Sequence, residues 1–288
     1  MVSRERVETR VIGVARVVWL AFVLVACVVP LFYMVLLSLQ PLQAVLADPL
    51  NVVPSPSEVN LAAYERVIAS PEDGGYGLLS FFGNSLIVAL GSVVLTVTLS
   101  VLGAYAATRL RFPGKNTINT AFFAVYMFPG IVMAIPLFVL FSRLGLRGEL
   151  PALIIIYLAS TVPVSVYMLR NYFRSIPQGL EDAAMVDGCN RSQVIRRIVL
   201  PLAMPSIAAT SLYVFMIAWN EYLFALLFLL ERRDNWTVSL GLAQLDDISV
   251  STTVLMAGSV LLTLPVVVLF FAAERLLVEG LTAGAEKG

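Results

Sequence analysis

Six long apolar runs constrain the fold of this chain more than any other feature of its sequence. A transmembrane α-helix needs about 20 mostly apolar residues to cross the hydrocarbon core of a bilayer. The six runs that meet this length are residues 14–39, 82–107, 118–141, 152–172, 207–230 and 253–277. Only 13% of the 288 residues are charged, whereas soluble domains carry about 25%. The sequence therefore predicts an all-α, polytopic membrane protein with six transmembrane helices.

Lysine and arginine are distributed unevenly between the two sides that these six helices define. Fourteen of them fall in the segments on one side: Arg4, Arg6, Arg10, Arg16, Arg109, Arg111, Lys115, Arg170, Arg174, Arg191, Arg196, Arg197, Arg275 and Lys287. Five fall on the other side: Arg66, Arg143, Arg147, Arg232 and Arg233. Cytoplasmic loops carry the excess of basic residues. We therefore expect a multi-pass protein of the cell membrane with both termini in the cytoplasm.

This orientation divides the chain into regions. Residues 1–13 form a cytoplasmic N-terminus, 14–39 the first helix and 40–81 an extracytoplasmic loop. A core of five helices is expected over 82–278, with a cytoplasmic loop at 175–205 and an extracytoplasmic loop at 231–250, and residues 279–288 form a cytoplasmic tail. The N-terminus also resembles a secretory signal with cleavage after residue 47. Its apolar run of about 26 residues, however, exceeds the roughly 7–15 residues of signal cores.

Composition argues against several chemical functions. The formal net charge is zero and the chain has no histidine, so neither a general basic field nor the commonest transition-metal ligand is present. No G-x-x-x-x-G-K-[ST] phosphate loop occurs in the sequence, and we expect any ATP hydrolysis to take place on another subunit. The two cysteines, Cys27 and Cys189, fall at different predicted depths, which disfavours a disulfide. We predict no enzyme activity, no metal site and no cofactor bound by this chain.

The polar loop 175–205 is unusual in so apolar a chain. Pro177 suits the first turn of a helix, and Gly188 suits the position after its end, where a positive φ is needed. Asn190 suits the N-cap of a second helix, which Pro201 and Pro205 limit. We expect Leu180, Ala183, Ala184 and Val186 to share one face of the first helix, with Glu181, Asp182 and Asp187 outside it. On charge alone the loop would be a solvated connector between two helices. The spacing of its alanine, glycine and proline residues indicates a further role.

That spacing resembles the EAA loop of bacterial ABC importer permeases. The shared landmarks are Asp182-Ala183-Ala184, Gly188, Ile198 and Leu200-Pro201. Asp182 departs from the usual glutamate, and Cys189 stands where alanine is common. RFPGKN at 111–116, AWNEYL at 218–223 and the tail GLTAGAEKG extend the resemblance, the last two toward the carbohydrate-uptake branch with its maltose-type permeases.

The resemblance implies the transmembrane fold of a type I ABC importer and a set of partners. These are a second homologous permease subunit, two copies of a cytoplasmic ATPase that bind ATP and magnesium, and an extracytoplasmic sugar-binding protein or lipoprotein. The loop would be the coupling helix that contacts the ATPase. The residues implied in this coupling are Glu181, Asp182, Ala183, Ala184, Asp187, Gly188, Ile198, Leu200 and Pro201. The substrate would be a sugar, such as maltose or trehalose.

Two further sets of residues are candidates for function. A substrate path is expected at Tyr126, Tyr213, Trp219, Asn220 and Glu221, with Met127 beside them; the alternative is packing, with Glu221 in a polar clasp between helices. A loop that contacts the binding protein is expected at Trp236, Leu240, Gly241 and Gln244; the alternative is an interfacial turn. The C-terminal tail either reaches the ATPases or is a frayed end.

Three other functions compete with sugar import. An ABC permease for polyols or glycerol-phosphate derivatives has the same appearance. An ion-coupled secondary transporter would need intramembrane acids, and Glu221 is the one carboxylate well inside a predicted span. The third is a membrane scaffold or a membrane enzyme. The sequence shows no nucleophile paired with a base and no metal cluster that would support catalysis.

Overall fold

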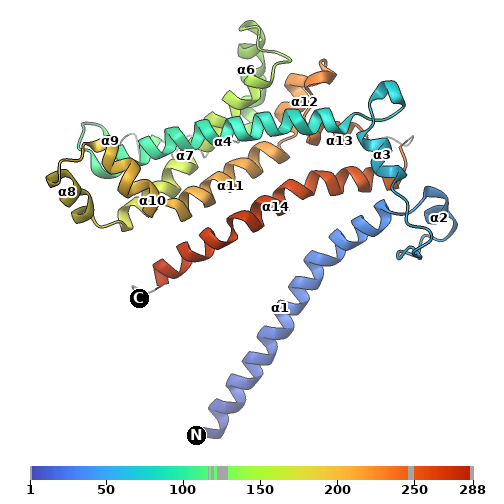
Figure 1. Cartoon of the computed structure of the whole chain (residues 1–288), viewed down its shortest axis with the longest axis horizontal. Coiled ribbons are helices and arrows are strands. Elements are labelled where there is room, and N and C mark those ends of the chain that lie inside the picture. Colours follow the sequence, from blue (N-terminus) through green and yellow to red (C-terminus); the bar gives the residue numbers. More distant parts are fainter. Residues whose placement is uncertain (1, 116, 118–119, 122–128, 246–249, 286–288) are drawn as a thin grey trace. The chain divides into compact units, whose positions relative to one another are not determined.

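A computed structural model describes residues 2–115, 117, 120–121, 129–245 and 250–285, and within these ranges the chain contains helices and no strand (Figure 1). The all-α prediction is confirmed for that part of the chain. The chain divides into two compact units, Met1–Leu78 with Leu245–Leu261 and Leu79–Gln244 with Leu262–Gly288.

Within the described residues, four helices are long and apolar enough to cross a membrane, or five if one bent pair counts as a span. The four spans are Val11–Ser38, Leu78–Arg109, Leu150–Ser175 and Thr252–Leu277. A polytopic membrane protein is thus confirmed, but the predicted count of six is not. Most of the first half of the expected span 118–141 lies outside the described residues, and its second half, α6 (Gly130–Arg143), has 14 residues.

The first unit contains a long helix followed by a folded loop. Helix α1 (Val2–Ser38) is followed by α2 (Leu42–Ala47), α3 (Ala62–Ile68) and η1 (Pro71–Asp73). In the most apolar 18-residue stretch of α1, only 6% of the residues are buried. The loop is tied together by Ser38, whose hydroxyl lies 2.7 Å from that of Tyr64, and by Gln40, whose amide donates to the Val52 carbonyl at 2.6 Å.

The second unit is built around α4 (Leu78–Arg109), α7 (Leu150–Ser175) and α11 (Met204–Asn220). Small hydroxyl residues lie buried where α4 meets α7, and the Thr96 and Thr161 hydroxyls are 3.0 Å apart. Small side chains let transmembrane helices approach closely and hydrogen-bond across their interface. Beside them, α6 contacts α12 (Leu223–Leu229) through edge-to-face packing of Phe138 and Phe141 on Phe228. The last helix, α14 (Thr252–Ala285), begins in the first unit and ends in the second.

The expected span 207–230 is not one continuous helix, which corrects the prediction. Helix α11 ends at Asn220, and α12 begins at Leu223 after a turn at Glu221 and Tyr222. The Glu221 carboxylate accepts hydrogen bonds from the backbone N–H groups of Phe224 at 2.8 Å and Ala225 at 3.2 Å. A side chain that binds the free N–H groups of a first turn starts a new helix, and hydropathy alone does not reveal such a break.

Candidate functional site

The loop 175–205 forms the helix–glycine–helix structure that its sequence predicts. Helix α8 (Gln178–Val186) follows Pro177 at its N-cap. It ends at Val186; two residues later Gly188 has a φ of +89°, and the Cys189 N–H donates back to the Ala184 carbonyl at 2.9 Å. A left-handed residue that closes such a bond is a common helix stop, and glycine adopts it without a Cβ clash.

The second helix of the loop begins with a reciprocal cap. The Asn190 side chain accepts from the Gln193 N–H at 3.0 Å, and the Gln193 side chain accepts from the Asn190 N–H at 2.8 Å. This pair fixes the start of α9 (Arg191–Val194) because it satisfies two free donors at once. The loop therefore has two defined helical directions joined by a short turn.

The chain then turns sharply into the membrane-spanning part. One turn of π-helix, η2 (Ile195–Val199), leads to α10 (Leu200–Leu202), and the segment Arg191–Leu202 meets α11 at an angle of 80°. Pro201 has no N–H, so the carbonyl four residues before it lacks its α-helical donor and the helix is locally widened. The helical segment ends at Leu202, between Pro201 and Pro205, the two residues expected to limit it.

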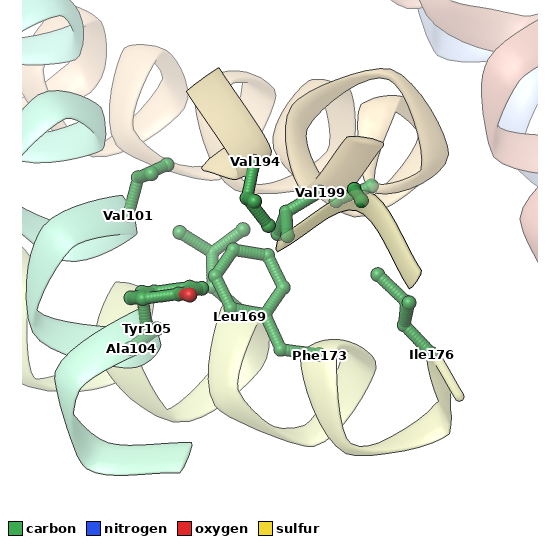
Figure 2. Close-up of a cluster of buried hydrophobic side chains, with 10 residues drawn as sticks. Val101, Ala104, Tyr105, Leu169, Phe173, Ile176, Val194 and Val199 are labelled. Atoms are coloured by element: carbon green, nitrogen blue, oxygen red, sulfur yellow. The ribbon is translucent and has the colours of Figure 1, made fainter. Parts of the chain in front are cut away.

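A buried apolar cluster holds this loop against the ends of α4 and α7 (Figure 2). Its members are Val101, Ala104, Tyr105, Leu169, Phe173, Ile176, Ala184, Val194, Val199 and Ala203. Ile198 and Leu200 pack against the cluster from the side. Ile198 and Leu200, two of the residues implied in coupling, therefore contact this cluster. Helix α8, which is too short to be stable alone, is stabilised by the same packing.

The outward face of α8 differs from the predicted one. Leu180, Met185 and Val186 are 48%, 41% and 88% exposed, together with Asp182 and Asp187. Ala184 and Glu181 are the buried residues of the helix. Of the four residues expected to share one face, Leu180, Ala183 and Val186 are exposed and Ala184 is buried, so they do not form a single stripe. We call the exposed set Leu180, Asp182, Met185, Val186 and Asp187 the α8 patch.

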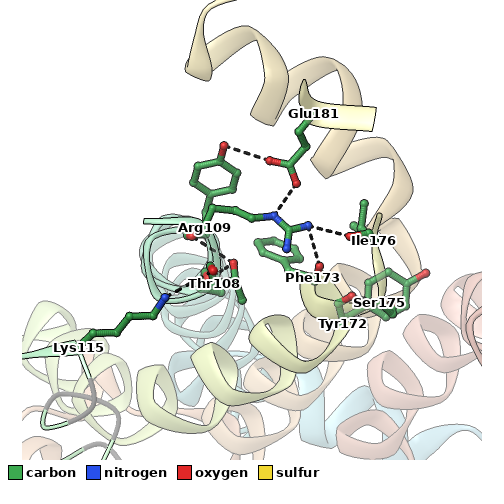
Figure 3. Close-up of polar contacts among 10 residues, drawn as sticks. Thr108, Arg109, Lys115, Tyr172, Phe173, Ser175, Ile176 and Glu181 are labelled. Atoms are coloured by element: carbon green, nitrogen blue, oxygen red, sulfur yellow. Dashed lines mark hydrogen bonds and ion pairs between the residues drawn. The ribbon is translucent and has the colours of Figure 1, made fainter. Parts of the chain in front are cut away.

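Glu181 faces inward because two residues of α4 bind its carboxylate (Figure 3). The Arg109 Nε donates to Oε1 at 2.6 Å, and the Tyr105 hydroxyl donates to Oε2 at 3.2 Å. In the sequence Arg109 is recognised only as one of the basic residues that define topology, and Tyr105 belongs to no motif. The one sequence feature that could have pointed to these two residues is their place at the end of an apolar run, just before a polar turn.

Glu221 forms the polar clasp that the sequence analysis gave as the alternative to a substrate contact. Besides capping α12, its carboxylate accepts from the Tyr157 hydroxyl of α7 at 2.6 Å, and its backbone carbonyl accepts from the Ser239 hydroxyl at 2.7 Å. A partly buried carboxylate with several donors is satisfied without a ligand. The clasp therefore joins α7, α12 and α13 (Val238–Gln244).

The other substrate-path candidates have different surroundings. Trp219 is fully buried, is stacked on Phe215 and donates its indole N–H to the Leu262 carbonyl at 2.9 Å. Asn220 is exposed, and Tyr213 is half-buried. Tyr126 and Met127 lie outside the described residues. The structure therefore makes Trp219 a packing residue of this unit and leaves Asn220 accessible.

The candidate loop for binding-protein contact is anchored to α4. Trp236 is half-buried, its ring lies 5.7 Å from that of Phe81, and Gln244 is exposed. Leu240 is fully buried, and a Cβ on Gly241 would lie 2.3 Å from Phe81 Cδ2. The four candidates therefore divide into two packing residues and two that present some surface.

Within the described residues no cluster of three His, Cys, Asp or Glu side chains is arranged to hold a metal ion. Cys27 and Cys189 are both free thiols in the structure.

Comparison with known proteins places these features in context. Residues 99–282 match the family described as "Binding-protein-dependent transport system inner membrane component". The inner membrane ABC transporter permease protein YcjP of Escherichia coli is 45% identical over 216 residues, which are 74% of this chain and 76% of that protein. The trehalose/maltose transport system permease protein MalG of Thermococcus litoralis is 34% identical over 287 residues, 99% of each chain.

The fold itself matches solved structures. A chain in the crystal structure of a bacterial ABC transporter involved in the import of the acidic polysaccharide alginate aligns with a TM-score of 0.79 and 23% identity. The alignment covers 92% of this chain and 96% of that one. The likeness confirms the expected transmembrane fold of ABC importer permeases.

Proposed function

This chain belongs to the family of binding-protein-dependent transport system inner membrane components, and from that premise we propose that it is the permease subunit of an ATP-driven sugar importer. The subunit forms half of a translocation pore with a second, homologous permease. A separate cytoplasmic ATPase, present in two copies with ATP and magnesium, drives alternating access. An extracytoplasmic binding protein or lipoprotein delivers the substrate.

The α8 patch is the observation that carries this proposal. It combines exposed Leu180, Met185 and Val186 with two carboxylates, on a short helix that leaves the apolar bundle. Apolar side chains exposed together on a polar loop mark a protein contact. A partner shifts a conformational equilibrium only through its different affinity for the two states. The patch is where the ATPase applies that difference, with Ala183 and Gly188 beside it.

The substrate is best assigned to the di- and oligosaccharides. The supporting observation is full-length similarity to a permease named for trehalose and maltose. A polyol or glycerol-phosphate derivative is the alternative within the same class. Ion-coupled transport is disfavoured because the Glu221 carboxylate already accepts from Tyr157 and two backbone N–H groups.

Reconstitution tests the function directly. The permease pair, ATPase and binding protein are placed in proteoliposomes with labelled maltose or trehalose outside and ATP inside. We expect uptake that needs ATP and the binding protein and that vanadate abolishes. Uptake driven by a sodium or proton gradient without ATP would overturn the proposal, and transport of a polyol in place of the sugars would select the alternative.

A single substitution tests the ATPase contact. Val186→Arg puts a charge in the centre of the α8 patch. The Val186 side chain is 88% exposed, so its replacement removes no buried contact. We expect the variant to insert normally but to lose at least about tenfold in co-purified ATPase, since 1.4 kcal/mol of lost affinity suffices for that factor. Val53→Arg, at a 66% exposed valine in the extracytoplasmic loop, is the matched control and should retain the ATPase.

A further inference from the structure

Three helices meet at one guanidinium group. Arg109 is the last residue of α4, and its Nε donates to the Glu181 carboxylate of α8 at 2.6 Å. Its Nη2 donates to the backbone carbonyls of Phe173 and Ile176, both at 2.9 Å, where α7 ends (Figure 3). One side chain thus bonds to α7 and α8 while it belongs to α4.

These hydrogen bonds satisfy the last carbonyl groups of α7 and two buried charges, which would be destabilising without partners. The last carbonyls of a helix have no donor of their own, and the negative end of the helix dipole favours a cation. The Arg109 and Glu181 side chains are only 9% and 5% exposed. Water therefore cannot easily replace either partner, and removing one alone leaves a buried charge unpaired.

The polar contacts add direction to the apolar contacts beneath α8. The cluster around Ala184, Phe173 and Val101 is held by the hydrophobic effect, which is not directional. Apolar surfaces alone therefore do not specify the angle of α8. A planar guanidinium that donates in fixed directions to a carboxylate and to carbonyls does specify it. The Tyr105 hydroxyl, at 3.2 Å from the second carboxylate oxygen, supports the same orientation.

We propose that Arg109 is a positioning residue for transport, which through Glu181 locks α8 to the ends of α4 and α7 so that the three move as one body. This rests on the proposed function, in which the ATPase acts on α8. It also assigns Glu181 a role inside this chain, while the α8 patch provides the contact with the partner. A movement of α8 then reaches two spans at once instead of being absorbed at the loop.

Spin-label distances in the assembled transporter test the proposal. One label is placed at Gln178→Cys on α8, outside the α8 patch, and the other at Leu102→Cys on α4, where the leucine is 54% exposed. Cys27 and Cys189 are replaced by serine. The measured quantity is the distance distribution between the labels, without nucleotide and after trapping with ATP and vanadate. We expect a narrow distribution with the same mean in both states.

The informative variant is Arg109→Gln combined with Glu181→Gln. It removes both charges together and keeps the side chains similar in size, so no unpaired buried charge threatens folding. We expect the distribution to broaden or to differ between the two states, and the sugar transported per ATP to fall at least about tenfold. Arg111→Gln, which removes a nearby exposed charge, is the control and should match the parent. Arg109→Lys keeps the ion pair but not the planar fork, and an intermediate result is expected.

The outcomes separate this proposal from the one on which it rests. A distribution that stays narrow and unchanged in the double glutamine variant, with normal transport per ATP, would overturn the positioning role. If instead the ATPase does not act on α8, Val186→Arg retains the ATPase while the double variant still broadens the distribution. Failure of the positioning role therefore leaves the distance distribution unchanged, whereas failure of the ATPase contact leaves the co-purified ATPase unchanged.

Discussion

The carboxylates of Glu181, which is buried, and Glu221, which is partly buried, are stabilised by different kinds of donor. Glu181 is bound by a cation, the Arg109 guanidinium, and by one hydroxyl. Glu221 is bound by the neutral Tyr157 hydroxyl and by two N–H groups at the start of α12. Charge is therefore matched by charge at Glu181, whereas at Glu221 the important property is the ability to accept hydrogen bonds.

Glu221 is expected to tolerate loss of its charge but not of its oxygen. Glu221→Gln keeps an acceptor at the N-terminus of α12 and should retain more than half of parental uptake. Glu221→Ala removes the cap, which is worth about 0.5–2 kcal/mol, and should lower both uptake and thermal stability in detergent. If glutamine is as damaging as alanine in the uptake assay, the charge itself is required and the clasp interpretation is wrong.

Gly241 is expected to tolerate no side chain. A Cβ at this position would lie 2.3 Å from the Phe81 ring, which is itself only 4% exposed. Gly241→Ala should destabilise the protein by about 1–3 kcal/mol through overpacking, measured as a lower melting temperature of the purified subunit. Gly83→Ala in α4, where a Cβ meets nothing within 4 Å, is the control and should leave the melting temperature equal or higher.

At the scale of elements, the turn between α8 and α9 sets the direction of the loop 175–205, which we propose contacts the ATPase. Gly188 has a φ of +89° and open space around its Cβ position. Gly188→Ala therefore introduces backbone strain of roughly 1–2 kcal/mol without a clash. We expect lower ATP-dependent uptake with normal membrane insertion. Gly179→Ala, also in open space but without a positive φ, controls for the added methyl group, and an equal loss in both variants would contradict the role of the turn.

The elements of this loop could be predicted because their causes are local. A glycine at a left-handed position and an Asn190–Gln193 cap act over a few residues of sequence, so spacing alone identifies them. The inward orientation of Glu181 depends on Arg109, 72 residues earlier in the chain. No pattern within α8 contains that partner, and hydrophobicity alone does not predict that Glu181 is buried beside Ala184.

The break between α11 and α12 was missed for a related reason. Residues 207–230 are apolar almost throughout, so their hydropathy is that of one span. What divides them is the capping of α12 by Glu221 and the bond from Tyr157 in another helix. An acidic residue inside an apolar run is a signal for such a site, but it does not distinguish a substrate contact from a helix cap.

At the scale of the whole molecule, orientation is a prediction that labelling can check. The fourteen basic residues on one predicted side require the loop around Val186 to be cytoplasmic and Glu72 to be outside. In a variant without native cysteines and in cells that lack the ATPase, a membrane-impermeant maleimide should label Glu72→Cys in intact cells. Val186→Cys should be labelled only in inverted vesicles. The reverse pattern would invert the topology.

The α8 patch has a consequence for how the cell makes this protein. Lipid covers the spans of a newly inserted copy, but Leu180, Met185 and Val186 are exposed on α8. In the proposed function they stay in water until the ATPase covers them. Surplus copies therefore display the kind of surface that binds nonspecifically and aggregates. Balanced synthesis of the permease and its ATPase is therefore expected to yield more intact membrane protein than synthesis of the permease alone. The difference would come from the three apolar side chains that stay exposed without the ATPase.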